Sequence, residues 1–101
     1  ELIKNVRSDI ILVIDSAYAE YVENDLYIDG ASLVENYNNV IMLRTFSKLH
    51  GLASLRLGWA YCPLFISNLL KSIRPAFSVN TLASFAGTAS IQDIEFQKYH
   101  F

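Results

Sequence analysis

The chain has 101 residues, of which 52% are apolar and 18% are charged, and its formal net charge is −2. This length allows one hydrophobic core, with a radius of gyration of about 13 Å if the chain is compact. The charge balance offers no basic surface to nucleic acid or to an anionic membrane, and the single cysteine excludes an internal disulfide. We therefore expect one cytoplasmic domain with neither kind of partner.

Apolar runs and turn signals predict an α/β arrangement. Residues 9–14 form a β-branched run without polar alternation, which is typical of a strand covered on both faces in a parallel sheet. Asn80 is expected to cap the last helix, whose apolar face would include Leu82 and Phe85. The elements expected in chain order are the tail of a helix at 1–6, a strand at 9–14, a helix at 31–37, a strand at 40–43, a loop at 44–52, a strand at 55–61, a helix at 66–73 and a helix from 80 to about 96.

The loop after the second strand carries the residues with the clearest chemical meaning. Pyridoxal phosphate needs an amine to bond its aldehyde, a carboxylate at its ring nitrogen, and hydroxyls and a fixed cation at its phosphate. Lys48 offers the amine, Asp15 the carboxylate, Thr45 and Ser47 the hydroxyls, and Arg56 the cation. The pattern therefore predicts a site for this cofactor, with Asp15 at the carboxyl end of its strand, where ligands of α/β sheets bind.

Each of these residues also has an ordinary structural explanation. Most lysines such as Lys48 are solvated, and an aspartate such as Asp15 often caps the turn after a strand. Tyr18 can donate its hydroxyl to the phenolate oxygen of the cofactor or pack under the loop. Arg56 is expected to open an apolar strand, so its guanidinium must reach solvent or meet an anion. His50 has no second ligand at metal spacing, and we expect no metal site.

Two segments resemble a known family. Residues 45–59, TFSKLHGLASLRLGW, resemble the lysine signature of the class I and II aminotransferases with the aspartate-aminotransferase fold. Residues 13–22, VIDSAYAEYV, resemble the strand of that family that carries its aspartate and tyrosine. Within the superfamily the likeness is closest to bacterial histidinol-phosphate aminotransferases, and it extends over about residues 9–89. Ser16 stands where many relatives have an acidic residue, and Phe77 where many have tyrosine.

The resemblance implies a role for each candidate residue and a mostly parallel sheet with flanking helices. It makes Lys48 the Schiff-base lysine and the general base that moves the proton of the substrate Cα. The cofactor-binding residues that it implies are Asp15 at the ring nitrogen, Tyr18 at the phenolate oxygen, Thr45, Ser47 and Arg56 at the phosphate, and Lys48 itself.

Family members are several-fold longer than this chain and form homodimers. We therefore expect residues 1–101 to be a central fragment of the cofactor-binding large domain, without the small domain and the N-terminal segments. The expected activity of the full-length parent is transamination between histidinol phosphate and 2-oxoglutarate or glutamate. An aromatic amino acid aminotransferase and a threonine-phosphate decarboxylase are alternatives. A hypothesis of another class is that the chain alone is a non-catalytic fragment that self-associates through exposed sheet edges and apolar helix faces. A small binding module that carries the motif by accident is a third.

Overall fold

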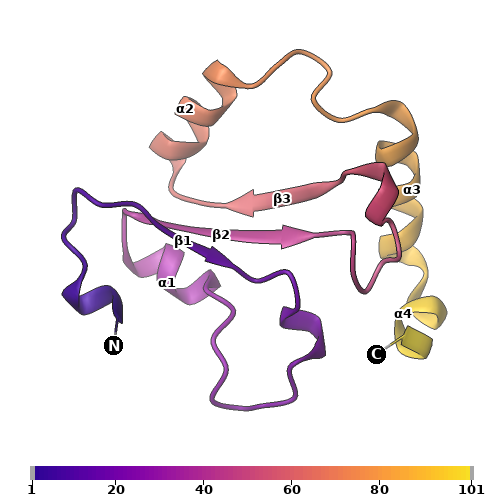
Figure 1. Cartoon of the computed structure of the whole chain (residues 1–101), viewed down its shortest axis with the longest axis horizontal. Helices are drawn as coiled ribbons and strands as arrows, with labels where there is room; N and C mark the ends of the chain where they lie inside the picture. Colours follow the sequence, from indigo (N-terminus) through magenta and orange to yellow (C-terminus); the bar gives the residue numbers. More distant parts are fainter. Residues whose placement is uncertain (1, 101) are drawn as a thin grey trace.

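A small three-stranded sheet organises the molecule. The computed structural model describes residues 2–100, and its sheet has the order β1-β2-β3 (Figure 1). β1 (Leu12–Asp15) runs parallel to β2 (Val40–Thr45), and β2 pairs antiparallel with β3 (Gly58–Tyr61). The parallel pairing expected for the first strand is thus confirmed, and an antiparallel edge strand is common on otherwise parallel sheets.

Helices and short 3₁₀ turns connect and flank the strands. The α-helices are α1 (Ala31–Asn36), α2 (Leu64–Ile73), α3 (Thr81–Gln92) and α4 (Ile94–His100). The 3₁₀ turns are η1 (Leu2–Asn5), η2 (Ala19–Tyr21) and η3 (Ala53–Leu55). None of the helices formed by residues 2–100 has the length and apolar character needed to cross a bilayer.

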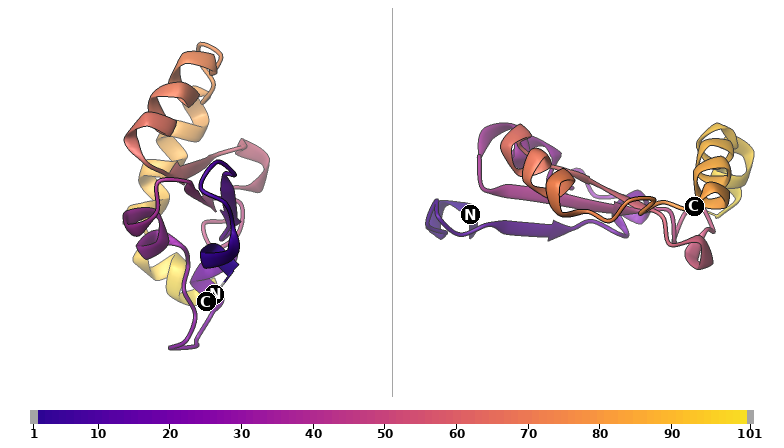
Figure 2. Two further views of the ribbon diagram at one scale, coloured as in Figure 1. Left: turned by 90° about the vertical axis from the view of Figure 1, so that its left-hand side faces the viewer. Right: turned by 90° about the horizontal axis from the view of Figure 1, so that it is seen from above.

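The molecule is flat and open. Its extents are 41 × 38 × 18 Å and its radius of gyration is 15.2 Å, larger than the value of about 13 Å for a compact chain of this length. Figure 2 shows the reason, since α3 and α4 stand beyond one end of the sheet and do not lie across it. The described residues consequently leave many apolar side chains in solvent, including Phe77 at 98% and Leu26 at 89% exposure.

The best-packed part of the core lies on one face of the β1–β2 pair. Val40 and Met42 of β2 are almost fully buried there, and they pack with Val34 of α1 and Ile3 of η1. Alternate residues of β1 join this cluster, whereas Val13 on the opposite face is 51% exposed. The prediction of a strand at 9–14 that is covered on both faces is therefore wrong, because the β1 strand begins at Leu12 and only one of its faces is covered.

Several predicted boundaries also shift. The helix tail expected at 1–6 is the 3₁₀ turn η1, and Glu1 lies outside the described residues. The second strand continues to Thr45, because Thr45 still pairs with Gly58. The third strand does not begin at residue 55, because the chain first forms η3 and then places Arg56 at φ +54°, a left-handed conformation outside the strand region.

The last predicted helix is two helices. Asn80 caps α3 as expected, since its Oδ1 accepts a hydrogen bond of 2.8 Å from the backbone N–H of Ala83. α3 ends at Gln92, and Asp93 accepts from the N–H of Phe96 to start α4. The buried face of α3 is formed by Ala83 and Gly87, and the larger apolar residues of the predicted face are exposed: Leu82 at 72% and Phe85 at 74%. The helix approaches the sheet end through its small residues, because Leu57 and Phe46 lie close to Gly87.

Candidate functional site

The loop that carries Lys48 is anchored at both ends. The backbone N–H of Phe46 donates to the carbonyl of Leu57 (3.1 Å), and the N–H of Leu52 donates back to the carbonyl of Phe46 (2.9 Å). Gly51, at φ +66°, donates to the carbonyl of Lys48 (2.9 Å). Phe46 is buried at 8% exposure, whereas Lys48 is exposed. The loop is thus a fixed turn that presents the lysine amine at the surface.

Lys48 lies against Tyr18. Its Nζ is 4.7 Å from the centroid of the Tyr18 ring, a distance at which an ammonium group is attracted to the face of an aromatic ring. Tyr18 is 59% exposed. The two residues come from segments 30 positions apart, and they meet because the parallel strands β1 and β2 end at the same edge of the sheet.

Asp15 ends β1 at this same edge. One oxygen of its carboxylate accepts a hydrogen bond of 3.1 Å from the N–H of Ala17, so it does cap the following turn. Its side chain is nevertheless exposed, and it lines an open cavity of about 420 Å³. The residues around this cavity are Asp15, Ser16, Ala17, Tyr18, Val22 and Tyr27. The recess therefore places a carboxylate and a phenol on a common surface.

The three residues expected to bind the phosphate do not form one group, in contrast to the contact between Lys48 and Tyr18. Thr45 and Ser47 are neighbours in the turn, and the Thr45 hydroxyl oxygen accepts from the N–H of Ser47 (3.1 Å). Arg56 does not open β3 as expected. It follows η3, its guanidinium donates to the carbonyl of Ala53 (2.8 Å), and its side chain is exposed. The Thr45 hydroxyl is thus held against the backbone of Ser47, whereas the arginine bonds to its own turn.

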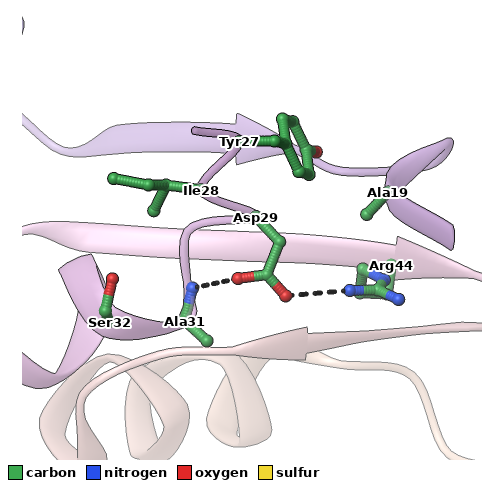
Figure 3. Close-up of a pocket in the computed structure, with 7 residues that line it drawn as sticks. All are labelled: Ala19, Tyr27, Ile28, Asp29, Ala31, Ser32 and Arg44. Carbon is green, nitrogen blue, oxygen red and sulfur yellow. Dashed lines mark hydrogen bonds and ion pairs between the residues drawn. The ribbon is translucent and has the colours of Figure 1, made fainter. Parts of the chain in front are cut away.

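A cluster of charges beside these residues was not recognised in the sequence. Arg44 donates to Glu20 (2.7 Å) and to Asp29 (3.1 Å), and its guanidinium lies 5.9 Å from the centre of the Trp59 ring. Figure 3 shows Arg44 and Asp29 on the wall of a second cavity, of about 510 Å³. The available signal in the sequence is a charged residue directly after an apolar run, but the predicted loop at 44–52 places Arg44 outside the strand.

Comparisons with known proteins agree on one family. The family model described as aminotransferase class I and II matches residues 1–101. Histidinol-phosphate aminotransferase of Rhodospirillum centenum is 52% identical over 89 residues, which are 88% of this chain and 25% of the relative. The enzyme of the same name from Pelagibacter ubique is 44% identical, over 95% of this chain and 27% of the relative. The chain thus spans about a quarter of the length of these curated relatives.

Solved structures share the fold of the chain. The crystal structure of histidinol-phosphate aminotransferase from Sinorhizobium meliloti in complex with pyridoxal-5′-phosphate has a TM-score of 0.86 and 28% identity, over 96% of this chain and 26% of that one. L-threonine-O-3-phosphate decarboxylase of Porphyromonas gingivalis has a TM-score of 0.74 at 21% identity, over 95% and 29% of the two chains, and shows likeness of fold alone. The predicted fold class is confirmed by these structures.

Proposed function

Because the chain belongs to the aminotransferase class I and II family, we propose that residues 1–101 are the central part of a pyridoxal-phosphate-binding domain and that the whole protein is an aminotransferase. The observation that carries this proposal is the contact between the Lys48 amine and the Tyr18 ring at the carboxyl edge of the parallel strands. Open α/β sheets bind their ligands at this edge.

The side chains at this edge fit the chemistry of the cofactor. Lys48 provides an exposed primary amine on an anchored loop, and Asp15 provides an exposed carboxylate beside an open cavity. Thr45 and Ser47 provide hydroxyls, and Arg56 provides a guanidinium, whose planar fork matches a phosphate. When bound, the cofactor would supply an electron sink for the negative charge that develops at the substrate Cα.

Each of these side chains has a defined task in transamination. Lys48 would hold the cofactor and then, as a free amine, would take the proton from the substrate Cα and deliver it to the cofactor carbon C4′. Asp15 would hold the ring nitrogen of the cofactor in its protonated form, because a carboxylate stabilises a neighbouring positive charge; two opposite charges about 4 Å apart attract by about 4 kcal/mol at a dielectric constant near 20. Tyr18 would donate its hydroxyl to the phenolate oxygen, and the phosphate would be bound by Thr45, Ser47 and Arg56.

The substrate that we propose is histidinol phosphate, with glutamate and 2-oxoglutarate as the exchanging pair. The names of the relatives that match at 52% and 44% identity support it. Their common role in making histidine also supports a location in the cytoplasm, where we place the protein. An aromatic amino acid and a threonine phosphate stay as alternatives, and a panel of these substrates with the full-length protein distinguishes them. Turnover of the aromatic amino acid alone would refute the choice of histidinol phosphate.

A second proposal concerns the 101-residue chain by itself. The open shape and the exposed apolar side chains favour self-association without catalysis, because such patches pair with other surfaces. We also expect the whole protein to be a homo-oligomer, because members of the family that it resembles form homodimers. Light scattering on the isolated chain tests this proposal, and a single monomeric species at high concentration would contradict it.

The cofactor proposal is tested by locating the bound pyridoxal phosphate. The full-length protein is mixed with the cofactor, reduced with borohydride and digested, and the modified lysine is identified by mass spectrometry. We expect the label on Lys48, and we expect its loss together with the visible absorption of the bound cofactor in Lys48→Ala. Lys71→Ala, which removes an exposed lysine of α2, is the matched control and should retain both signals. Labelling of several lysines to an equal extent would refute the assignment.

A further inference from the structure

Three ionised side chains meet where β2 ends. The Nη2 of Arg44 lies 2.7 Å from the Oε1 of Glu20, and its Nη1 lies 3.1 Å from the Oδ2 of Asp29. The side chains of Arg44 and Glu20 are only 15% and 19% exposed, and that of Asp29 is 38% exposed. The two carboxylates come from different segments, η2 and the residue before Gly30, so that one guanidinium joins both segments to β2. Figure 3 shows the contact between Arg44 and Asp29.

The surroundings fix the orientation of this guanidinium. A planar fork that binds two carboxylates cannot rotate without losing one of them. The Nε of Arg44 is buried and has no hydrogen-bond partner in the described part of the chain, so the two terminal nitrogens carry the polar contacts. The ring of Trp59 lies on the adjacent strand, 5.9 Å from the guanidinium carbon. Arg44 therefore acts as a fixed bridge.

The bridge lies next to the contact between Lys48 and Tyr18. Arg44 directly precedes Thr45 and is four residues before Lys48, and Glu20 is two residues after Tyr18. The bond from the N–H of Ser16 to the carbonyl of Leu43 (3.0 Å) continues the β1–β2 ladder, and the following turn is then joined to β2 through side chains. The ion pair of Arg44 and Glu20 thus lies in one continuous set of contacts with the Lys48 ammonium group and the Tyr18 ring.

Asp29 strengthens the same arrangement. Its backbone carbonyl accepts a hydrogen bond from the hydroxyl of Ser16, which is 2% exposed, and its carboxylate caps the N–H of Ala31 (3.0 Å). The residue that binds Arg44 is thus also tied to the start of the Tyr18 turn and to the start of α1. A movement of Arg44 would therefore displace the Tyr18 turn through both of its partners, Glu20 and Asp29.

We propose that Arg44 is a positioning residue that holds the Tyr18 turn against the loop bearing Lys48. The inference rests on the proposed function, because it assigns Arg44 to the site that Lys48 and Tyr18 form. Loss of the Arg44 charge releases Glu20, the turn moves away from β2, and the Lys48 amine loses the aromatic ring beneath it. Arg44 need not touch cofactor or substrate for this effect.

The test measures the reactivity of individual lysines in the full-length protein without cofactor. Competitive acylation with trace acetic anhydride, read by mass spectrometry, gives the rate at Lys48 relative to Lys71. The Nζ of Lys48 must leave the face of the Tyr18 ring, 4.7 Å away, before it can attack the reagent. Tyr18→Leu should therefore raise the relative rate at Lys48 about two- to five-fold, the effect of losing one exposed cation–aromatic contact. Arg44→Met should raise it to the same level.

Further variants separate positioning from general damage to the fold. Glu20→Gln removes the charge that ties η2 to Arg44, so it should reproduce most of the increase in the Lys48 rate. The pair of Arg44 and Asp29 stays intact in this variant. Arg44→Lys should restore part of the wild-type rate, because it keeps the charge. Arg7→Met, which breaks an exposed arginine–aspartate pair, is the matched control and should leave Lys48 unchanged.

The possible results point to different conclusions. A normal Lys48 rate in both Arg44→Met and Glu20→Gln, together with a raised rate in Tyr18→Leu, would overturn the role of Arg44. Equal rates in wild type and Tyr18→Leu would overturn it as well. Failure of the proposed function is a separate result, because it appears as absence of the borohydride-fixed label on Lys48 and not as a change in acylation rate.

Discussion

Replacing Asn80 with alanine is expected to destabilise the start of α3 by about 2 kcal/mol. The Oδ1 of Asn80 accepts from the N–H of Ala83 (2.8 Å), and loss of such a cap costs about 1 kcal/mol. Its Nδ2 donates to the carbonyl of Leu55 (3.2 Å), and loss of a hydrogen bond of this kind costs about 1 kcal/mol more. The same side chain thus starts the helix and attaches it to η3, next to Arg56.

Hydrogen exchange of the α3 amides measures this loss locally. Since about 1.4 kcal/mol corresponds to a factor of ten, exchange in the first turns of α3 should accelerate about 30-fold in Asn80→Ala. Asn80→Asp keeps the acceptor for Ala83 and loses only the donor to Leu55, so about 1 kcal/mol and about five-fold acceleration are expected. Thr88→Ala is the matched control within the same helix, and its exchange should not accelerate.

Two outcomes would refute this reasoning. Unchanged exchange in Asn80→Ala would show that α3 is held in place without the cap. Equal acceleration in the alanine and aspartate variants would show that the bond to Leu55 carries the whole effect and that capping contributes nothing.

The remaining predictions concern two glycines and one ion pair. Gly58→Ala should cost about 1–3 kcal/mol in urea unfolding, because the new Cβ would lie 2.9 Å from a backbone carbonyl oxygen of β2. Gly87→Ala should leave the free energy of unfolding nearly unchanged, although its Cβ would lie 2.4 Å from Leu57. The atom contacted is the end of a flexible side chain, and alanine favours the helix. A larger loss of stability than in Gly58→Ala would contradict this. The hydrogen bonds from Arg7 hold the pKa of Asp9 below its ordinary value of about 3.9. The pair therefore contributes its full stability above that pH, and this contribution is lost as the pH falls through the lowered pKa of the folded state. Arg7→Gln should return the NMR titration of Asp9 to its usual range.

The sequence was sufficient to predict features that depend on local chemistry. The parallel start of the sheet, the helix at residues 31–37 and the cap at Asn80 follow from β-branched runs, periodicity and a side chain that bonds to its own backbone neighbours. The signature around Lys48 was enough to identify the family, because its spacing is specific to one cofactor and fold. The helix and the cap need no contacts between distant segments, whereas the parallel pairing joins two distant segments and was predicted from the residue types of one strand.

Tertiary structure alone decided how distant segments meet. The left-handed conformation of Arg56, the antiparallel pairing of β3 and the burial of small rather than large residues on α3 all depend on packing against other segments. The bridge of Arg44 could not be predicted for the same reason. Its two partners lie 15 and 24 residues away, and which side chains meet across such distances depends on the path of the loops between them.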